Sequence, residues 1–421
     1  MTQAFALEGA HRATSGRRGR RILGVADRLA GALGFSPGAW SGGQLIELAR
    51  HRNRLTDFGD NSFQEPLEVL ARSYEEEANL STFGRMAARW DTLRFLSNLL
   101  NLRAAEQEDS AILQEAIEQP IFITGLPRSG TTFLHNLLIQ DRENLAVRCW
   151  ETIYPCATRT APMVVPDRRA SKVKRQLDTF AWLVPEIRQV HRLGADSPQE
   201  CTEITAHVFQ SLRFDTTHKV PTYRQWLDNA GHLAAYRFHR RFLKHLQYGN
   251  GKGARRWVLK SPDHVFALDA ILDVYPDARF VFVHRNPVDV LPSVAQLTEI
   301  LRRPFTRQVE RVEIGEQVSE RWRRGAEILV AFSSTSRASS HCIAHLDFGS
   351  LVRNPLGSVA ALYERFGLTF SNAFADRVLA TVAEWPRGGY RHDKPALEEY
   401  GLNPGTERRR FSAYMECFGV R

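Results

Sequence analysis

Apolar residues recur at helical spacing over the first part of the chain, from about residue 41 to residue 118. The segment 63–80 repeats apolar side chains every three or four positions, and a longer segment of the same kind follows Ser81, a residue type that caps helices. We expect residues 41–118 to form a layer of helices that packs on a sheet. Residues 1–40 carry the run "RRGRR" and are predicted to be a basic, flexible N-terminal arm.

After residue 118 the pattern changes to short apolar runs that alternate with helical segments. The runs typical of buried strands lie at 121–124, 255–261, 278–287 and 342–352. The segments with helical spacing between them lie at 170–183, 197–212, 231–248 and 264–276. This alternation predicts an α/β fold, in which a parallel sheet is wound by helices over residues 119–421.

The stretch "GLPRSGTT", residues 125–132, lies between the first predicted strand and a helical segment at 131–138. Its glycines have the spacing of a P-loop, but Thr131 stands where a loop for ATP or GTP places lysine, and Arg128 lies inside the loop. Glycine allows the backbone to approach an oxyanion, and a helix start adds N–H donors. An ordinary strand–turn–helix connection is the alternative. We predict a P-loop-like anion site made by Arg128, Ser129, Gly130, Thr131 and Thr132.

Two further predicted strands also end in basic residues. Lys260 ends the second strand, Arg285 follows the third, and Ser293 comes after Pro292, which we expect to restart a helix. Because the carboxyl ends of parallel strands meet at one edge of a sheet, these side chains are expected to converge on the loop. Taken alone, each is also typical of a solvated residue at a strand end.

The composition narrows the class of ligand. The formal charge of +9 suits an anionic small molecule, since no aromatic-basic motif of a nucleic-acid module is present. The five cysteines are scattered and never in C-x-x-C spacing, which favours reduced thiols in the cytoplasm over disulfides or a metal site. No apolar run reaches the length of a membrane span. The sequence leaves open whether the chain forms a homo-oligomer.

"GLPRSGTT" followed by "HRNPVDVLPS" resembles the two nucleotide signatures of sulfotransferases that use 3′-phosphoadenosine 5′-phosphosulfate (PAPS). The order and context are similar to the Arg-loop branch, which includes tyrosylprotein sulfotransferases and a large bacterial group. "WVLKSPDH", "YPDARFVFVHRNP" and "LVRNPLGSVAALYERFGL" fit the bacterial group in the same order. The resemblance implies sulfuryl transfer from PAPS to a hydroxyl-bearing small-molecule or lipid acceptor, with adenosine 3′,5′-bisphosphate (PAP) as product and without a metal.

The resemblance also implies roles for single residues. Arg128 and Lys260 would stabilise charge during transfer, and Arg285 and Ser293 would hold the 3′-phosphate. The base would be Glu151 in "VRCWETIYP". The alternatives for the base are His191, Asp196 and Glu200.

Further segments are expected around the acceptor and the nucleotide. Lys394 would lie in a C-terminal element that returns to the nucleotide. Helical insertions, with segments 178–187 and 297–312 among them, are expected to cover the acceptor pocket.

Two other functions stay open at the level of the sequence. A P-loop kinase needs a lysine after Gly130 and an acidic Mg²⁺ ligand at a strand end, whereas these strands end in basic residues. A non-catalytic module that binds adenosine bisphosphate would keep the nucleotide residues and lose the base, but Glu151 is present.

Overall fold

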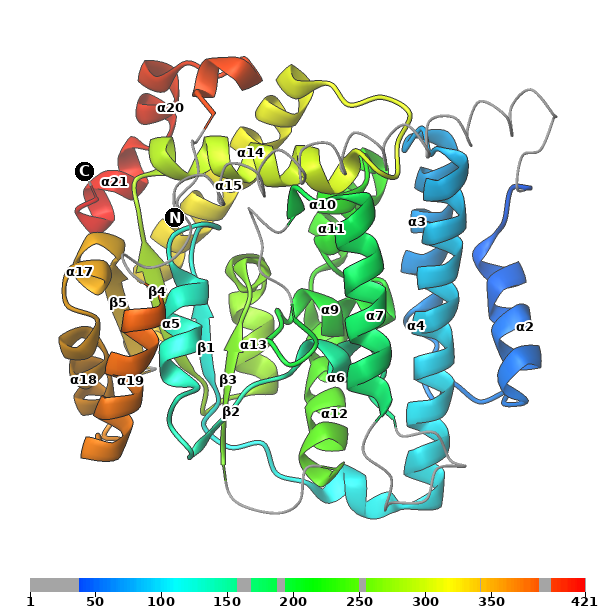
Figure 1. The fold of residues 1–421 in the computed structure, drawn as a ribbon, viewed down its shortest axis with the longest axis horizontal. Coiled ribbons are helices and arrows are strands. Elements are labelled where there is room, and N and C mark those ends of the chain that lie inside the picture. Colours follow the sequence, from blue (N-terminus) through cyan, green and yellow to red (C-terminus); the bar gives the residue numbers. More distant parts are fainter. Residues whose placement is uncertain are drawn as a thin grey trace, which may run out of the picture.

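The computed structural model describes residues 38–156, 168–187, 194–249, 255–340, 342–385 and 395–420. The predicted N-terminal arm therefore lies, except for its last three residues, outside the described residues. At the centre is a parallel sheet with the strand order β2-β3-β1-β4-β5 (Figure 1). The strands are β1 (Ile121–Thr124), β2 (Asn144–Leu145), β3 (Arg256–Lys260), β4 (Arg279–His284) and β5 (Ile343–Asp347). The predicted parallel sheet is thus confirmed.

Alternate residues of the central strands face opposite sides of the sheet, as extended backbone requires. Phe122 and Phe280 belong to a hydrophobic cluster with α4 (Thr82–Glu108), α12 (Leu233–Gly249), α13 (Leu268–Val274) and α15 (Arg311–Ser333). Ile121, Ile123 and Val281 belong to a second cluster with α5 (Thr131–Leu138), α18 (Pro355–Arg365) and α19 (Asn372–Glu384). Because both faces are covered by helices, the strands are apolar almost throughout. Figure 1 shows α18 and α19 on one side of the sheet and the N-terminal helices on the other.

The N-terminal layer consists of α2 (Gly42–Asn53), α3 (Gln64–Glu76) and α4 (Thr82–Glu108). Ser81 caps α4, as predicted, because its Oγ accepts the N–H of Gly84 at 3.0 Å. Side chains of this layer share one hydrophobic cluster with a face of the sheet. The domain boundary expected at residue 118 stays a prediction.

The remaining helices connect the strands and surround their carboxyl ends. The α-helices are α5 (Thr131–Leu138), α6 (Cys149–Ile153), α7 (Arg168–Leu183), α9 (Thr202–Thr205), α10 (Arg213–Thr217), α11 (Pro221–Ala230), α12 (Leu233–Gly249), α13 (Leu268–Val274), α14 (Pro287–Arg302), α15 (Arg311–Ser333), α16 (Ser336–Ser340), α17 (Phe348–Arg353), α18 (Pro355–Arg365), α19 (Asn372–Glu384), α20 (Pro404–Arg410) and α21 (Ser412–Phe418). The 3₁₀ helices are η1 (Ser110–Gln114), η2 (Ala206–Val208), η3 (Pro262–Ala267) and η5 (Leu397–Tyr400).

Two predictions about helices were wrong. The segment 197–212 is not one helix but the short α9 and η2, which end where Phe209 takes the left-handed conformation, with φ at 56°. Pro292 does not restart a helix; it lies inside α14, which begins at Pro287. The earlier start is set by Asn286, whose side chain accepts the N–H of Val288 at 2.9 Å and so caps the helix there.

Candidate active site

The loop between β1 and α5 is held closely against the neighbouring strand end. Gly125, Arg128 and Gly130 have φ values of 140°, 64° and 100°, a range in which glycine is favoured. A Cβ atom on Gly125 would lie 2.3 Å from the carbonyl oxygen of Val283, at the end of β4. The loop therefore needs glycine at this position to pass over the end of β4.

The three predicted basic sites meet at the carboxyl edge of the sheet. Arg128 Nε donates to Ser293 Oγ at 3.1 Å, and Arg285 Nη1 donates to the carbonyl oxygen of Arg128 at 3.0 Å. Lys260 Nζ donates to Thr132 Oγ1 at 3.3 Å. The convergence expected from the parallel strands is confirmed, although the roles assigned to these residues stay predictions.

The loop has the donor set that an anionic group requires. Ser129 is fully buried, and its Oγ has no hydrogen-bond partner among the described residues. Burial lowers the pKa of Arg285, and the nearby charge of Arg128 lowers it further. An orphaned hydroxyl and two partly desolvated guanidinium groups fit a ligand rich in negatively charged oxygens. Arg285 also lies over the ring of Phe348, with its Cζ 4.1 Å from the ring centroid.

Lys260 is buried, with 2% of its surface exposed, and it is paired with a carboxylate. Its Nζ lies 2.5 Å from Glu200 Oε1. Glu200 lines a cavity of about 990 Å³ that also includes the loop residues Arg128 and Thr132. A cation and a carboxylate thus stand together where the loop and the cavity meet.

Glu151, the predicted base, is placed differently. It is 3% exposed, and its Oε2 accepts the N–H of Arg148 at 2.7 Å, which caps the start of α6. In the described part of the chain the residues lining the cavity include Glu200 but neither Glu151 nor the exposed Asp196. His191 and Lys394 lie outside the described residues.

The far part of the cavity is apolar and is walled by helices. Both segments that were expected to cover the acceptor pocket contribute to it, through Phe180 and Ile187 on one side and Leu297, Leu301 and Phe305 on the other. The ring of Phe305 stacks on Phe83 of α4 and on Phe180 of α7, with centroid distances of 5.9 and 6.2 Å. These aromatic contacts join α4, α7 and the turn that follows α14 into one wall.

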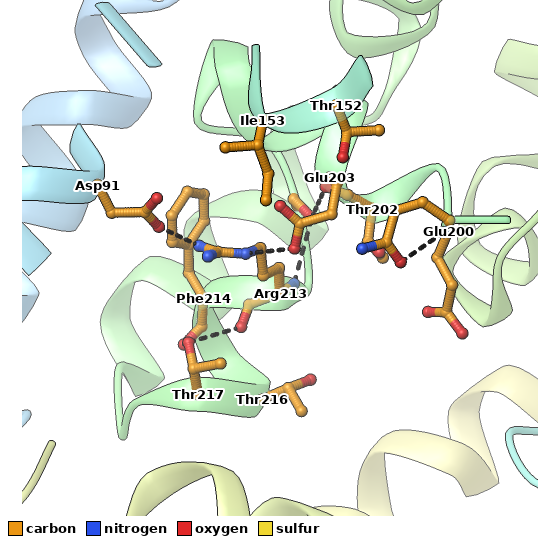
Figure 2. Close-up of polar contacts among 12 residues, drawn as sticks. Asp91, Thr152, Ile153, Glu200, Thr202, Glu203, Arg213, Phe214, Thr216 and Thr217 are labelled. Carbon is orange, nitrogen blue, oxygen red and sulfur yellow. Dashed lines mark hydrogen bonds and ion pairs between the residues drawn. The ribbon is translucent and has the colours of Figure 1, made fainter. Parts of the chain in front are cut away.

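A half-buried ion network also lines the cavity (Figure 2). Arg213 binds Asp91 and Glu203, each at 2.6 Å. Although burial opposes ionisation, Arg213 and Arg94 lower the pKa of Asp91 to about 2. Sequence reasoning did not find this network, because its members lie on three separate segments of the chain.

The described residues contain no group of three or more His, Cys, Asp or Glu side chains placed to hold a metal ion. None of their helices combines the length and the apolar character that crossing a membrane requires.

Comparison with known proteins decides the family. The sequence model described as "Sulfotransferase family" matches residues 120–372, which is more than half of the chain. The chain belongs to this family. This sulfotransferase also resembles the crystal structure of sulfotransferase STF1 from Mycobacterium tuberculosis H37Rv, with a TM-score of 0.76 and 28% identity over 89% of this chain and 99% of that one.

Other relatives of this sulfotransferase are also bacterial. The structure of STF9 from Mycobacterium avium matches with a TM-score of 0.80 and 23% identity over 90% of this chain and 97% of that one, which supports the fold. The omega-hydroxy-beta-dihydromenaquinone-9 sulfotransferases Stf3 of Mycobacterium bovis and Mycobacterium tuberculosis are 26% identical over 195 residues, or 44% of this chain. The match spans 47% of each Stf3 chain, about half the length of these relatives.

Proposed function

We propose that this sulfotransferase moves a sulfuryl group from PAPS to a hydroxyl group of an apolar small-molecule or lipid acceptor. The observation that carries the proposal is the convergence of Arg128, Arg285 and Lys260 around a loop that has no lysine after its second glycine. The phosphosulfate group carries less negative charge than the triphosphate group of ATP, so arginine and hydroxyl donors can hold it without Mg²⁺ and a P-loop lysine.

The donor would be held by residues of two loops. The 5′-phosphosulfate would be bound at the start of α5, by the hydroxyl groups of Ser129, Thr131 and Thr132 and by the first N–H groups of the helix. Arg285 and Ser293 would bind the 3′-phosphate, a group that ATP lacks. Both contact Arg128, so the two halves of the donor site are linked before a nucleotide binds.

The chemical step would be an in-line displacement at sulfur. The acceptor oxygen forms a bond to sulfur while the bond from sulfur to the phosphate oxygen breaks, which gives a sulfate ester and PAP. The hydroxyl proton would go to Glu200, the carboxylate that lines the cavity beside Lys260. Lys260 and Arg128 would stabilise the charge that develops on the sulfuryl and leaving phosphate oxygens. We assign the base to Glu200 rather than to Glu151 because only Glu200 lines the cavity.

The acceptor would have a large apolar part. The aromatic and aliphatic side chains around Phe305 give the cavity an apolar wall, which matches a hydrocarbon skeleton better than a sugar or a peptide. The Stf3 relatives are named for an omega-hydroxy menaquinone derivative, an apolar molecule with a hydroxyl group. A hydroxylated lipid-like compound is therefore our first choice.

The donor proposal predicts a clear order of ligands in thermal unfolding. PAP should raise the melting temperature of the full chain, whereas ATP with Mg²⁺ should raise it much less, because at equal concentration the ligand that binds the folded state more tightly stabilises it more. Arg285→Ala should remove most of the PAP effect, and Arg353→Ala, a change of an exposed arginine on α17, should not. An equal or larger shift with ATP would contradict the proposal.

Transfer itself needs a second measurement. The protein is incubated with PAPS and a panel of hydroxylated lipids, phenols and alcohols, and the products are examined by mass for the gain of a sulfate. A non-catalytic PAP-binding module would show the thermal shift without any such product, so the two readouts separate binding from catalysis.

A further inference from the structure

Two buried arginines line the cavity at the place where α14 ends against α15. Arg302 is the last residue of α14 and exposes 5% of its surface. Arg321 lies in the middle of α15 and exposes 7% of its surface. Both are among the residues that line the cavity. Guanidinium groups stay charged when buried, so they need partners on the protein or on a ligand.

Arg321 uses only part of its guanidinium group within the protein. Nη1 donates to Asp228 of α11, and the plane of the group lies over the ring of Phe266, with its Cζ 3.7 Å from the centroid. Nε and Nη2 are buried and have no hydrogen-bond partner in the described part of the chain. These two atoms form one edge of the planar group, the edge that can bind both oxygens of a carboxylate at once.

Arg302 adds a third unpartnered donor to the same wall. Its Nη1 donates to Gln317 Oε1 at 2.9 Å, and its Nη2 donates to the carbonyl oxygen of Asp215 at 2.6 Å. Nε has no partner among the described residues. Gln317 and Arg321 are four residues apart on α15 and so lie on one face of that helix, which brings the two arginines to the same part of the cavity.

The carboxylates near these arginines do not compensate the charge fully. Asp228 is shared, because Arg324 Nη1 also lies 2.6 Å from it. Asp263 and Asp215 also line the cavity, and Asp215 Oδ1 lies 4.0 Å from Arg302 Nη2. Burial raises the pKa of Asp215, and burial together with Glu200 raises the pKa of Asp263 to about 7. The donors on this wall that have no partner in the described part of the chain are Nε and Nη2 of Arg321 and Nε of Arg302, and these are the atoms that a negative ligand would pair with.

We propose that the Nε–Nη2 edge of Arg321, supported by Arg302, is a carboxylate-binding subsite of the acceptor cavity. This inference rests on the proposed function and deepens it: the acceptor is an amphipathic hydroxy acid. Its hydroxyl group lies at Lys260 and Glu200, its apolar skeleton lies in the cavity, and its carboxylate binds Arg321. The subsite is close to the reacting end, because Phe266 belongs to η3, which begins two residues after Lys260.

The test compares acids with their esters. Acceptors are a series of ω-hydroxy fatty acids of increasing chain length and the methyl ester of each, and binding to the protein with PAP is measured by calorimetry. At the preferred length the acid should bind about tenfold or more tightly than its ester, since two charge-assisted hydrogen bonds are lost in the ester. The same preference should appear in KM rather than in kcat when sulfate transfer is followed.

Variants identify the residue that gives this preference. Arg321→Gln should bring the affinity for the acid to that for the ester, whereas Arg324→Gln, which changes the other arginine on Asp228, should leave the preference intact. Arg321→Lys keeps a charge near Asp228 but lacks the two-donor edge, so it should also lose the preference. This variant keeps the test valid where Arg321→Gln fails to fold.

The outcomes separate this proposal from the proposed function. Equal affinity of the wild-type protein for acid and ester at every length, with sulfate transfer still observed, would overturn the carboxylate subsite and leave the sulfotransferase activity standing. If PAP did not raise the melting temperature and no sulfated product formed, both the proposed sulfotransferase function and the carboxylate subsite would be contradicted.

Discussion

At the scale of single residues, the pair of Lys260 and Glu200 is the most informative contact in the candidate site. Its two charged atoms are 2.5 Å apart, at the junction of the donor loop and the cavity. The contact places a carboxylate, the kind of group that can take a proton from a hydroxyl, directly beside a cation. When charge develops on the sulfuryl group, the same lysine can stabilise it.

The two candidate bases can be compared with one conservative change each. Glu200→Gln should lower transfer to an alkyl alcohol by about 10² to 10⁴ in single-turnover rate at saturating PAPS, because glutamine cannot take a proton. Glu151→Gln should keep most of the rate, since its side-chain oxygen can still accept the N–H of Arg148. A phenol acceptor should suffer less from Glu200→Gln, because its proton leaves more easily. A large loss of transfer rate with Glu151→Gln, but not with Glu200→Gln, would show that Glu151 is the base.

The sequence predicted the residues that follow strands and did not predict those that meet across the fold. Arg128, Lys260 and Arg285 each follow an apolar strand, and parallel strands fix where such residues converge. The direction of a carboxylate such as Glu151 depends on local caps that the spacing does not show. Arg213 and Arg321 each bind a carboxylate more than ninety residues away, Asp91 and Asp228, and the spacing of residues along the chain does not indicate such contacts.

At the scale of elements, the donor loop depends on backbone positions as much as on side chains. Gly125 has φ at 140° and packs against a carbonyl oxygen of β4, which cannot rotate away as a side chain could.

Replacing two different glycines by alanine distinguishes the cost of backbone strain from the cost of a steric clash of the new Cβ atom. Gly231→Ala, with φ at 72° and no atom within 4 Å of the new Cβ, should cost about 1 to 3 kcal/mol of unfolding free energy from backbone strain alone. Gly125→Ala should cost more and should also weaken PAP binding, because its Cβ would meet the carbonyl oxygen of Val283 at 2.3 Å. Urea unfolding gives the loss of unfolding free energy for each variant, and the rise in melting temperature with PAP shows whether PAP binding is weakened. Equal costs would mean that the loop can move away from β4.

Strands and long helices followed the sequence pattern closely, whereas short elements did not. β1 was predicted at its observed residues because three apolar residues and Thr124, all buried, stand between Pro120 and Gly125. The segment 197–212 has helical spacing but breaks at Phe209, whose left-handed backbone no propensity indicates. Its ring is fully buried among other aromatic rings, so packing overrides the local preference.

At the scale of the whole molecule, burial of histidines couples stability to pH. His135, His207, His239 and His284 are almost completely buried, and burial lowers the pKa of each to about 3. In the unfolded chain the same groups titrate near pH 6.5. The folded state is therefore the one that binds fewer protons between these two values.

Stability should consequently fall as the solution becomes acidic. Because the folded pKa is depressed, each such histidine leaves stability intact above about pH 6.5 and removes up to about 1.4 kcal/mol per pH unit below it, down to its folded pKa. The free energy of unfolding in urea should thus drop steeply between about pH 7 and pH 5. His239→Gln should make this slope shallower, and His51→Gln, a change of an exposed residue on α2, should not. A flat profile over this range would show that few of these histidines stay neutral in the folded state.

The order of the strands also determines when the protein can fold during its own synthesis. β1 is the central strand and the first to be made, but Ile121 pairs with Val258 on one side and with Arg279 on the other. At the usual speed of translation, the ribosome needs on the order of ten seconds to supply these partners. During that interval the nascent chain carries an unpaired apolar strand, while the N-terminal helices, whose contacts are mostly local, can already form. The donor site is therefore completed late, when most of the chain has left the ribosome, and chaperones that bind apolar segments have time to act on β1.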